Sequence, residues 1–165
     1  MSELRNIIGM SLVFILVIDI FVMCHGFKFR STSIKDYYGD LYPYVLSCSI
    51  TNIGGISIIS DKVFESDDVK VRVKKCKTEY ETFNKILKSI GKVKYNSKQN
   101  NPSKIRKYGG NCQAYTLLLS AYLDNTDIDY EVVYGSSHMC LSVNLDDTYY
   151  VVDLVNGIFE EENDE

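Results

Sequence analysis

Three residues of this chain carry side chains that together could perform nucleophilic chemistry: Cys112, His138 and Asp153. A cysteine thiolate attacks a carbonyl carbon, an imidazole holds the thiolate and later protonates the leaving group, and a carboxylate orients the imidazole. The only other histidine, His25, lies in an apolar N-terminal segment. The rest of the chain therefore offers one candidate base for Cys112.

The stretch YGGNCQAYTLLLSAYL, from Tyr108 to Leu123, predicts that Cys112 begins a helix. Gly109 and Gly110 permit a tight turn and a close approach of the backbone just before it. At the start of a helix, unpaired amides and the positive end of the helix dipole favour a thiolate. The amide of Cys112 could also stabilise an oxyanion. We expect the helix to run from Asn111 to about Leu123.

Two predicted strands, His138 to Leu145 and Thr148 to Val155, would hold the other two residues. Asp146 and Asp147 provide a two-residue turn between them. In the register that this turn sets, Asp153 lies on the same face as His138 and diagonally across from it, within reach of an imidazole. A register shifted by one residue would put the two side chains on opposite faces.

Upstream of Cys112, the pattern predicts a small sheet followed by a helix. Residues 41–76 contain YVLSCSI, a turn at NIGG, ISIIS, and VKVRVKKC with valines alternating against basic residues, as in strands with one buried face. Thr78 and Glu81 form a capping box that starts an amphipathic helix, and Gly91 ends it. A polar loop then leads to the glycine pair, and YEVVYG at residues 130–135 predicts another strand.

The segment from Ile7 to Phe27 predicts one membrane helix. Its apolar run spans about 31 Å at helical rise, close to the hydrocarbon thickness of a bilayer. No small-residue cleavage site follows it, which favours an uncleaved anchor over a removed signal peptide. We expect a single-pass membrane protein, and basic residues on both sides of the helix leave the side of the soluble domain open.

The chain is expected to divide into four parts. Residues 1–27 form the anchor, 28–40 a polar linker, 41–159 one soluble domain with its catalytic core at 78–156, and 160–165 an acidic tail without structural signal. The length allows a single core of this size.

Composition excludes several classes of protein. Between Asp61 and Lys107, fourteen Lys and Arg residues face six Asp and Glu residues, although the whole chain carries a net charge of −4. We interpret this basic stretch as a solvated face, because aromatic residues do not interleave with it as in a nucleic-acid surface. Neither a disulfide scaffold nor a zinc ribbon is indicated by the odd number and wide spacing of the cysteines, which are Cys24, Cys48, Cys76, Cys112 and Cys140.

The order of these motifs resembles the core of the transglutaminase-like superfamily of papain-like cysteine enzymes. The likeness spans about Tyr95 to Asp153 and rests on a glycine-rich approach to a helix-start cysteine, a later histidine on a strand, and an aspartate ending the next strand. The resemblance implies that Cys112 is the nucleophile, His138 the base and Asp153 the orienting acid. It also implies an α+β fold with a papain-like core, in which the cysteine helix packs on an antiparallel sheet.

The chain departs from that family at several positions. Relatives often have an aromatic residue just after the histidine, where this chain has Met139 and Cys140. Relatives supply a Trp or Gln side chain upstream as an oxyanion donor, and this chain has no Trp. Gln99, Tyr108 and Gln113 are the candidate substitutes. These departures leave the substrate preference open.

We therefore expect a membrane-anchored cysteine enzyme that acts on amide bonds of a protein or peptide substrate through a thioester. In a peptidase or amidase, which is the preferred interpretation, water attacks the thioester. In a crosslinking transglutaminase, an amine attacks it. No cofactor and no nucleic-acid partner are expected. Two alternatives stay open: a catalytically inactive binding module with the same fold, and a metal site formed by Cys112, His138, Cys140 and Asp153.

Overall fold

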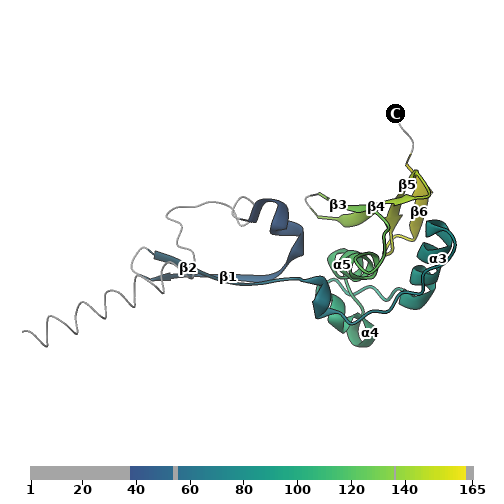
Figure 1. Ribbon diagram of the computed structural model, residues 1–165. Helices are drawn as coiled ribbons and strands as arrows, with labels where there is room; N and C mark the ends of the chain where they lie inside the picture. The colour runs from purple at the N-terminus through teal and green to yellow at the C-terminus, as the bar shows by residue number, and fades with distance from the viewer. Residues whose placement is uncertain (1–37, 54–55, 136, 163–165) are drawn as a thin grey trace, which may run out of the picture. The chain divides into compact units, whose positions relative to one another are not determined.

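A computed structural model describes residues 38–53, 56–135 and 137–162 (Figure 1). The chain divides into two compact units, one containing residues 47–62 and the other containing residues 40–46 and 63–162. Within the described ranges, no helix has the length and apolar character needed to cross a membrane. The predicted anchor, at residues 7–27, lies outside them, as does most of the predicted linker.

Strands β1 (Val45–Ile53) and β2 (Ile56–Val63) form a two-stranded sheet, most of which belongs to the first unit. This confirms the first two strands predicted for residues 41–76. The hydroxyl of Ser49 on β1 donates to the carbonyl oxygen of Ser60 on β2 at 3.3 Å. Residues ahead of β1 differ from the prediction, since η1 (Gly39–Tyr44) is a 3-10 helix with Pro43 inside it.

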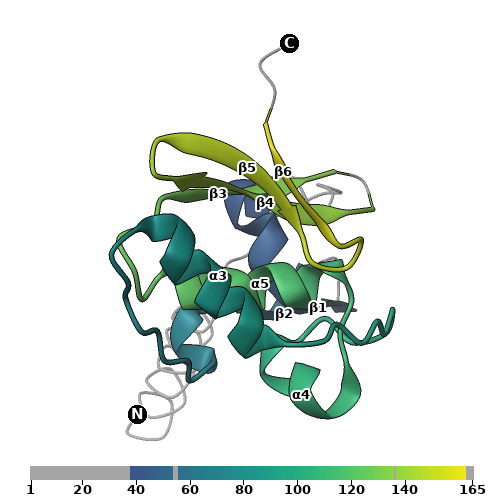
Figure 2. The same cartoon turned by 90° about the vertical axis from the view of Figure 1, so that its right-hand side faces the viewer.

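The second unit contains a four-stranded antiparallel sheet in the order β3-β4-β5-β6. The strands are β3 (Tyr130–Tyr134), β4 (Met139–Leu145), β5 (Thr148–Asp153) and β6 (Ile158–Glu161). Figures 1 and 2 show α3 (Glu79–Ile90) and α5 (Cys112–Leu123) on one face of this sheet. The α+β class with an antiparallel sheet is therefore confirmed.

The register between β4 and β5 is the predicted one. Leu145 pairs with Thr148, and the pairing continues to Leu141 and Val152. The turn residues Asp146 and Asp147 both have positive φ, 52° and 68°, which suits a two-residue hairpin turn of the primed type. The turn chemistry of two adjacent aspartates thus fixed the faces of both strands.

The core lies between the helices and the sheet. The hydroxyl of Thr116 on α5 donates to the carbonyl oxygen of Met139 on β4 at 3.0 Å and ties the helix to the strand. Alternate residues of β4 face the helices, because side chains along a strand point to opposite faces. The buried apolar residues of this core are Phe83, Ile86, Leu119, Leu123, Ile128, Leu141, Val143, Leu145 and Val152.

Helix α3 begins and ends as its sequence predicts. The side chain of Thr78 accepts from the amide of Glu81, and Gly91 ends the helix with φ of 74°. The carboxylate of Asp146, in the β4–β5 turn, accepts hydrogen bonds from the first two amides of the helix, those of Glu79 and Tyr80. A negative charge at a helix N-terminus is stabilising, so this contact fixes the turn against α3.

Three expectations about secondary structure are wrong. Residues 69–76, with their alternating valines, form no strand. The acidic C-terminal stretch begins inside β6, because Glu160 and Glu161 pair with Val151 and Tyr150. The polar loop before the glycine pair contains two short helices, η3 (Pro102–Lys104) and α4 (Ile105–Tyr108). In the first two cases long-range pairing, or its absence, outweighed the local pattern, whereas η3 begins with a local cap at Asn101.

Candidate active site

Helix α5 starts at Cys112, as predicted, with Asn111 as its capping residue. The side-chain oxygen of Asn111 accepts from the amide of Ala114 at 3.0 Å, and its carbonyl accepts from the amide of Tyr115 at 3.2 Å. The amides of Cys112 and Gln113 donate to no group in the described part of the chain. Two unpaired amide donors therefore lie at the start of the helix that Cys112 begins, and such groups can stabilise an oxyanion.

The two glycines before the helix are both required by space. Gly109 has φ of 74°, and a Cβ there would lie 2.2 Å from the carbonyl oxygen of Lys94. A Cβ at Gly110 would lie 2.8 Å from the Cβ of Ala114. Gly110 instead pairs with Tyr95 in an isolated parallel bridge. The glycines thus let the chain before α5 pack directly against the helix start.

His138 and Asp153 are in contact. Nε2 of His138 lies 2.6 Å from Oδ2 of Asp153. The His138 side chain is 42% exposed, whereas that of Asp153 is 5% exposed. An ionised carboxylate only accepts hydrogen bonds, so Nε2 of His138 is the donor in this contact and Nδ1 is the ring nitrogen left for proton transfer.

Asp153 is held in its ionised form by its neighbours. Burial raises the pKa of its carboxyl, but hydrogen bonds from Asn156 and His138 outweigh burial and bring the pKa below its ordinary value. Oδ1 accepts from the amides of Val155 and Asn156, and Oδ2 also accepts from the Asn156 side chain at 2.6 Å. The carboxylate is therefore fixed by the turn that follows it as well as by the histidine.

Sequence reasoning missed Asn156 as a residue that positions Asp153. Its side-chain amide and its backbone amide both reach the same carboxylate. The signal in the sequence was the stretch DLVNG, in which an Asp followed by Asn and Gly is typical of a turn that the Asp side chain closes. The predicted strand ran through this turn to Val155, whereas β5 ends at Asp153.

Cys112 lies at the edge of a second core cluster, partly buried, with its thiol free. Burial raises the pKa of the Cys140 thiol, and the negative charge of Asp153 raises it further. The cluster against which Cys112 packs includes Met139, the first residue of β4. No hydrogen bond joins Cys112 to His138, both of which the structure describes. Hydrogen bonds between catalytic groups are often long before substrate binds.

The three candidate oxyanion donors differ in their availability. Nε2 of Gln113 donates to the carbonyl oxygens of Pro43 and Val45, at 2.8 and 3.0 Å. The carbonyl oxygen of Gln99 accepts from the amide of Asn111 at 2.8 Å, so Gln99 adjoins the start of α5. Its side-chain oxygen accepts from a nearby amide, which leaves its Nε2 without a partner among the described contacts.

Tyr108, the third candidate, is half-exposed at the end of α4. Lys107 lies over its ring at 4.9 Å. Of the three, Gln99 thus combines a side-chain nitrogen without a partner among the described contacts with a backbone position next to Asn111.

The alternative of a metal site finds no support. Among the described residues, which include Cys112, His138, Cys140 and Asp153, no three His, Cys, Asp or Glu side chains converge in a way that could hold a metal ion. A metal site needs its ligands to converge on one point.

Comparisons of this chain with protein-family models, with curated proteins and with solved structures found no match. The resemblance to the transglutaminase-like superfamily, and the roles that it implies, stay predictions that rest on the chain's own residues.

Proposed function

We propose that this chain is a transglutaminase-like cysteine enzyme that hydrolyses amide bonds in a protein or peptide substrate. Cys112 is the nucleophile, His138 the base and Asp153 the residue that orients the base. The observation that carries the proposal is the contact between the buried carboxylate of Asp153 and the half-exposed imidazole of His138. A carboxylate with four hydrogen bonds holds one ring nitrogen and leaves the other for proton transfer.

The finer fold in this proposal is a papain-like core. A cysteine at the start of α5, a histidine ahead of β4 and an aspartate at the end of β5 are its parts. Antiparallel pairing of β4 with β5 and packing of α5 on β4 support this assignment.

The reaction follows from the positions of these groups. The thiolate sulfur attacks the carbonyl carbon, and the amides at the start of α5 stabilise the oxyanion. The protonated imidazole of His138 gives its proton to the leaving amine as the C–N bond breaks, which leaves a thioester on Cys112. Water then attacks the thioester and His138 takes a proton from that water. The C–S bond breaks, the acid leaves, and the thiolate and the protonated imidazole are restored.

Competitive alkylation with iodoacetamide tests the nucleophile. At neutral pH we expect Cys112 to react at least about tenfold faster than Cys48, Cys76 and Cys140, because a thiolate and not a thiol is alkylated. Cys140 is a close internal control, since the pKa of its thiol is raised. Equal rates at Cys112 and Cys48, measured by mass spectrometry of the digested protein, would refute the proposal.

A non-catalytic binding module with the same fold is the second candidate. The lack of a hydrogen bond between Cys112 and His138 favours it. Substitution of Cys112 by Ala discriminates between the two, because a binding module keeps its full biological activity without the thiol and an enzyme does not.

A further inference from the structure

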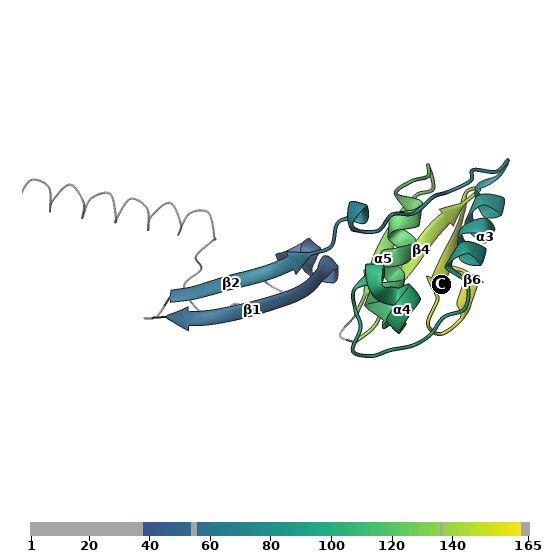
Figure 3. The ribbon, with the colours of Figure 1, turned by 90° about the horizontal axis from the view of Figure 1, so that it is seen from below.

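Residues 69–76 have the side-chain pattern of a strand but belong to no sheet. Val69, Val71 and Val73 are partly buried, and Val69 and Val73 pack against the two core clusters. The basic residues between them are exposed. Figure 3 shows the segment running as open chain from η2 (Ser66–Asp68) to α3. One face of an extended segment is therefore anchored in the core and the other faces solvent.

The backbone of this segment is unpaired. From Lys70 to Lys75, no amide and no carbonyl oxygen of the described chain makes a backbone hydrogen bond. The carbonyl of Lys74 accepts only a long contact from the thiol of Cys76, at 3.6 Å. Six extended residues span about 20 Å. A row of unpaired backbone groups of this length is a template for pairing with another strand.

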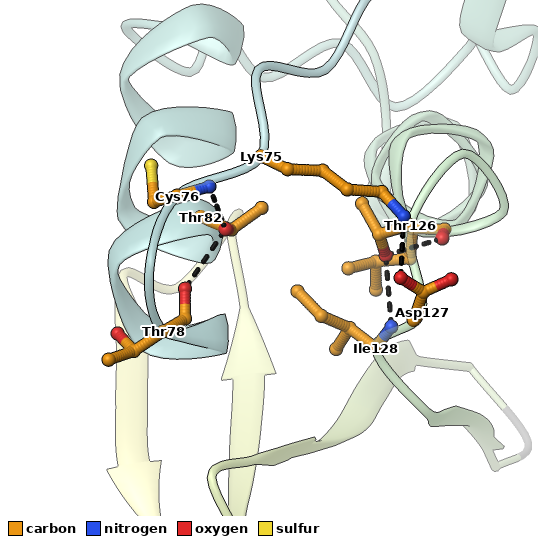
Figure 4. Close-up of polar contacts among 8 residues, drawn as sticks. Lys75, Cys76, Thr78, Thr82, Thr126, Asp127 and Ile128 are labelled. Carbon is orange, nitrogen blue, oxygen red and sulfur yellow. Dashed lines mark hydrogen bonds and ion pairs between the residues drawn. The ribbon is translucent and has the colours of Figure 1, made fainter.

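Both ends of the segment are fixed. The amide of Val69 donates to the carbonyl of Ser66 at 3.1 Å. At the other end the amide of Cys76 donates to the hydroxyl of Thr82 at 2.9 Å, and Lys75 forms an ion pair with Asp127 (Figure 4). The segment is thus held extended before any partner binds, which lowers the entropy that a partner must overcome.

Two neighbouring cavities, of about 520 and 320 Å³, lie along the segment and share Ser89. Lysine and arginine side chains dominate their polar lining, four in each cavity, and Asp68 is the one acidic residue that lines either of these described cavities. Val71, Ile90 and Leu118 provide apolar surface within the larger one. The groove next to the unpaired backbone is therefore basic at its edges and partly apolar inside.

We propose that residues 70–75 bind an extended acidic segment of a partner polypeptide by strand addition. Backbone pairing supplies the alignment, the basic side chains pair with alternate acidic residues of the partner, and the cavities take its apolar side chains. A polypeptide fits better than a nucleic acid, because only a strand presents amides and carbonyls in alternation to an unpaired edge. The site contains neither Cys112 nor His138, so it does not depend on the proposed enzymatic function.

Binding of synthetic peptides to the full-length chain in neutral detergent tests the proposal. The probe is a fluorescent, N-acetylated octapeptide in which glutamate alternates with valine and threonine, followed by fluorescence anisotropy. Two further versions carry N-methyl groups that block one or the other hydrogen-bonding edge. We expect one of them to bind at least about tenfold more weakly, because it loses the ladder of backbone bonds at unchanged charge. Equal affinity of all three versions would overturn strand addition.

Charge-reversal variants test the groove. Lys70→Glu combined with Arg72→Glu should weaken binding by about tenfold or more, since both exposed charges would then repel the peptide. Lys98→Glu combined with Lys107→Glu makes the same change in net charge outside both cavities, and should leave binding within about twofold. Equal weakening by the two pairs would reduce the interaction to non-specific attraction and overturn the proposal.

Amide hydrogen exchange gives the direct readout. Amides between Lys70 and Lys75 are expected to exchange rapidly in the free chain and to become protected when the unmodified peptide binds. Peptide binding without protection of these amides would contradict the assigned site. The proposal is also contradicted if a single-stranded oligonucleotide binds more tightly than the peptide and displaces it. Tighter binding of anionic phospholipid vesicles, with loss of the peptide, has the same meaning.

Discussion

Nε2 of His138 and Oδ2 of Asp153 lie 2.6 Å apart although fifteen positions separate the residues in the chain. The contact depends on the two-residue turn at Asp146 and Asp147, which sets the β4–β5 register. A slip of one residue would turn Asp153 to the other face of the sheet. The hairpin turn is therefore the feature that brings the candidate base to its carboxylate.

The role of the imidazole is tested by His138→Gln. We expect alkylation of Cys112 at neutral pH to slow by about tenfold, because the thiolate loses its ion-pair partner. Rates are measured by mass spectrometry with Cys48 as internal reference. Ser137→Ala, at the preceding exposed position, is the control and should leave the rate unchanged. An unchanged rate in His138→Gln would argue that the imidazole does not act on the thiol.

Acid stability should depend on Asp153. The pKa of its carboxyl is lowered in the folded chain, so its stabilising contribution is complete above the unfolded value of about 4 and is lost as the pH falls through the folded pKa. Asp153→Asn should remove this part of the decline in the free energy of unfolding below about pH 4.

Urea unfolding at a series of pH values measures this difference. Asp147→Asn is the matched control, because Asp147 is an exposed turn residue at positive φ, where Asn is also tolerated. If the free energy of unfolding of Asp153→Asn falls with pH as steeply as that of the natural chain, Asp153 is not the source of the acid sensitivity.

The close approach of the Lys94 backbone to Gly109 predicts a large loss of stability in the variant Gly109→Ala. The new Cβ would lie 2.2 Å from the carbonyl oxygen of Lys94, at a backbone φ of 74°. We expect the free energy of unfolding to fall by about 3 kcal/mol or more. In Gly135→Ala the new Cβ meets nothing within 4 Å, so its effect should stay within about 0.5 kcal/mol. Equal urea midpoints for the two variants would contradict the close approach at Gly109.

Two glutamines near the helix start should behave differently when replaced by Ala. Gln113→Ala removes hydrogen bonds to the carbonyls of Pro43 and Val45 and should lower the free energy of unfolding by about 1 to 2 kcal/mol. Gln99→Ala should affect stability less. It should lower the turnover of an amide substrate by about tenfold or more, since it removes the candidate side-chain donor to the oxyanion. Urea unfolding and hydrolysis rates separate the two effects, with Tyr108→Phe as control. A normal hydrolysis rate in Gln99→Ala would leave the backbone amides as the sole donors.

Local sequence signals were sufficient for the elements that hold the candidate site. The glycine pair and the stretch that follows it predicted α5, and the two aspartates predicted the β4–β5 turn and its register. Each of these signals acts within a few residues through capping or turn geometry. That is why they could be interpreted without knowledge of the rest of the chain.

Other features were decided only by the tertiary structure. The alternating valines at residues 69–76 predicted a strand, yet a strand also needs a partner, and no described segment pairs with it. The acidic residues at 160 and 161 gave no structural signal, but pairing with β5 makes them part of β6. The sequence by itself determined which faces its strands and helices present, because side-chain direction follows from local backbone geometry. The tertiary structure alone decided which backbone groups pair, that His138 reaches the carboxylate of Asp153, and that the side chain of Gln113 bonds to two distant carbonyls, since those contacts join residues far apart in the chain.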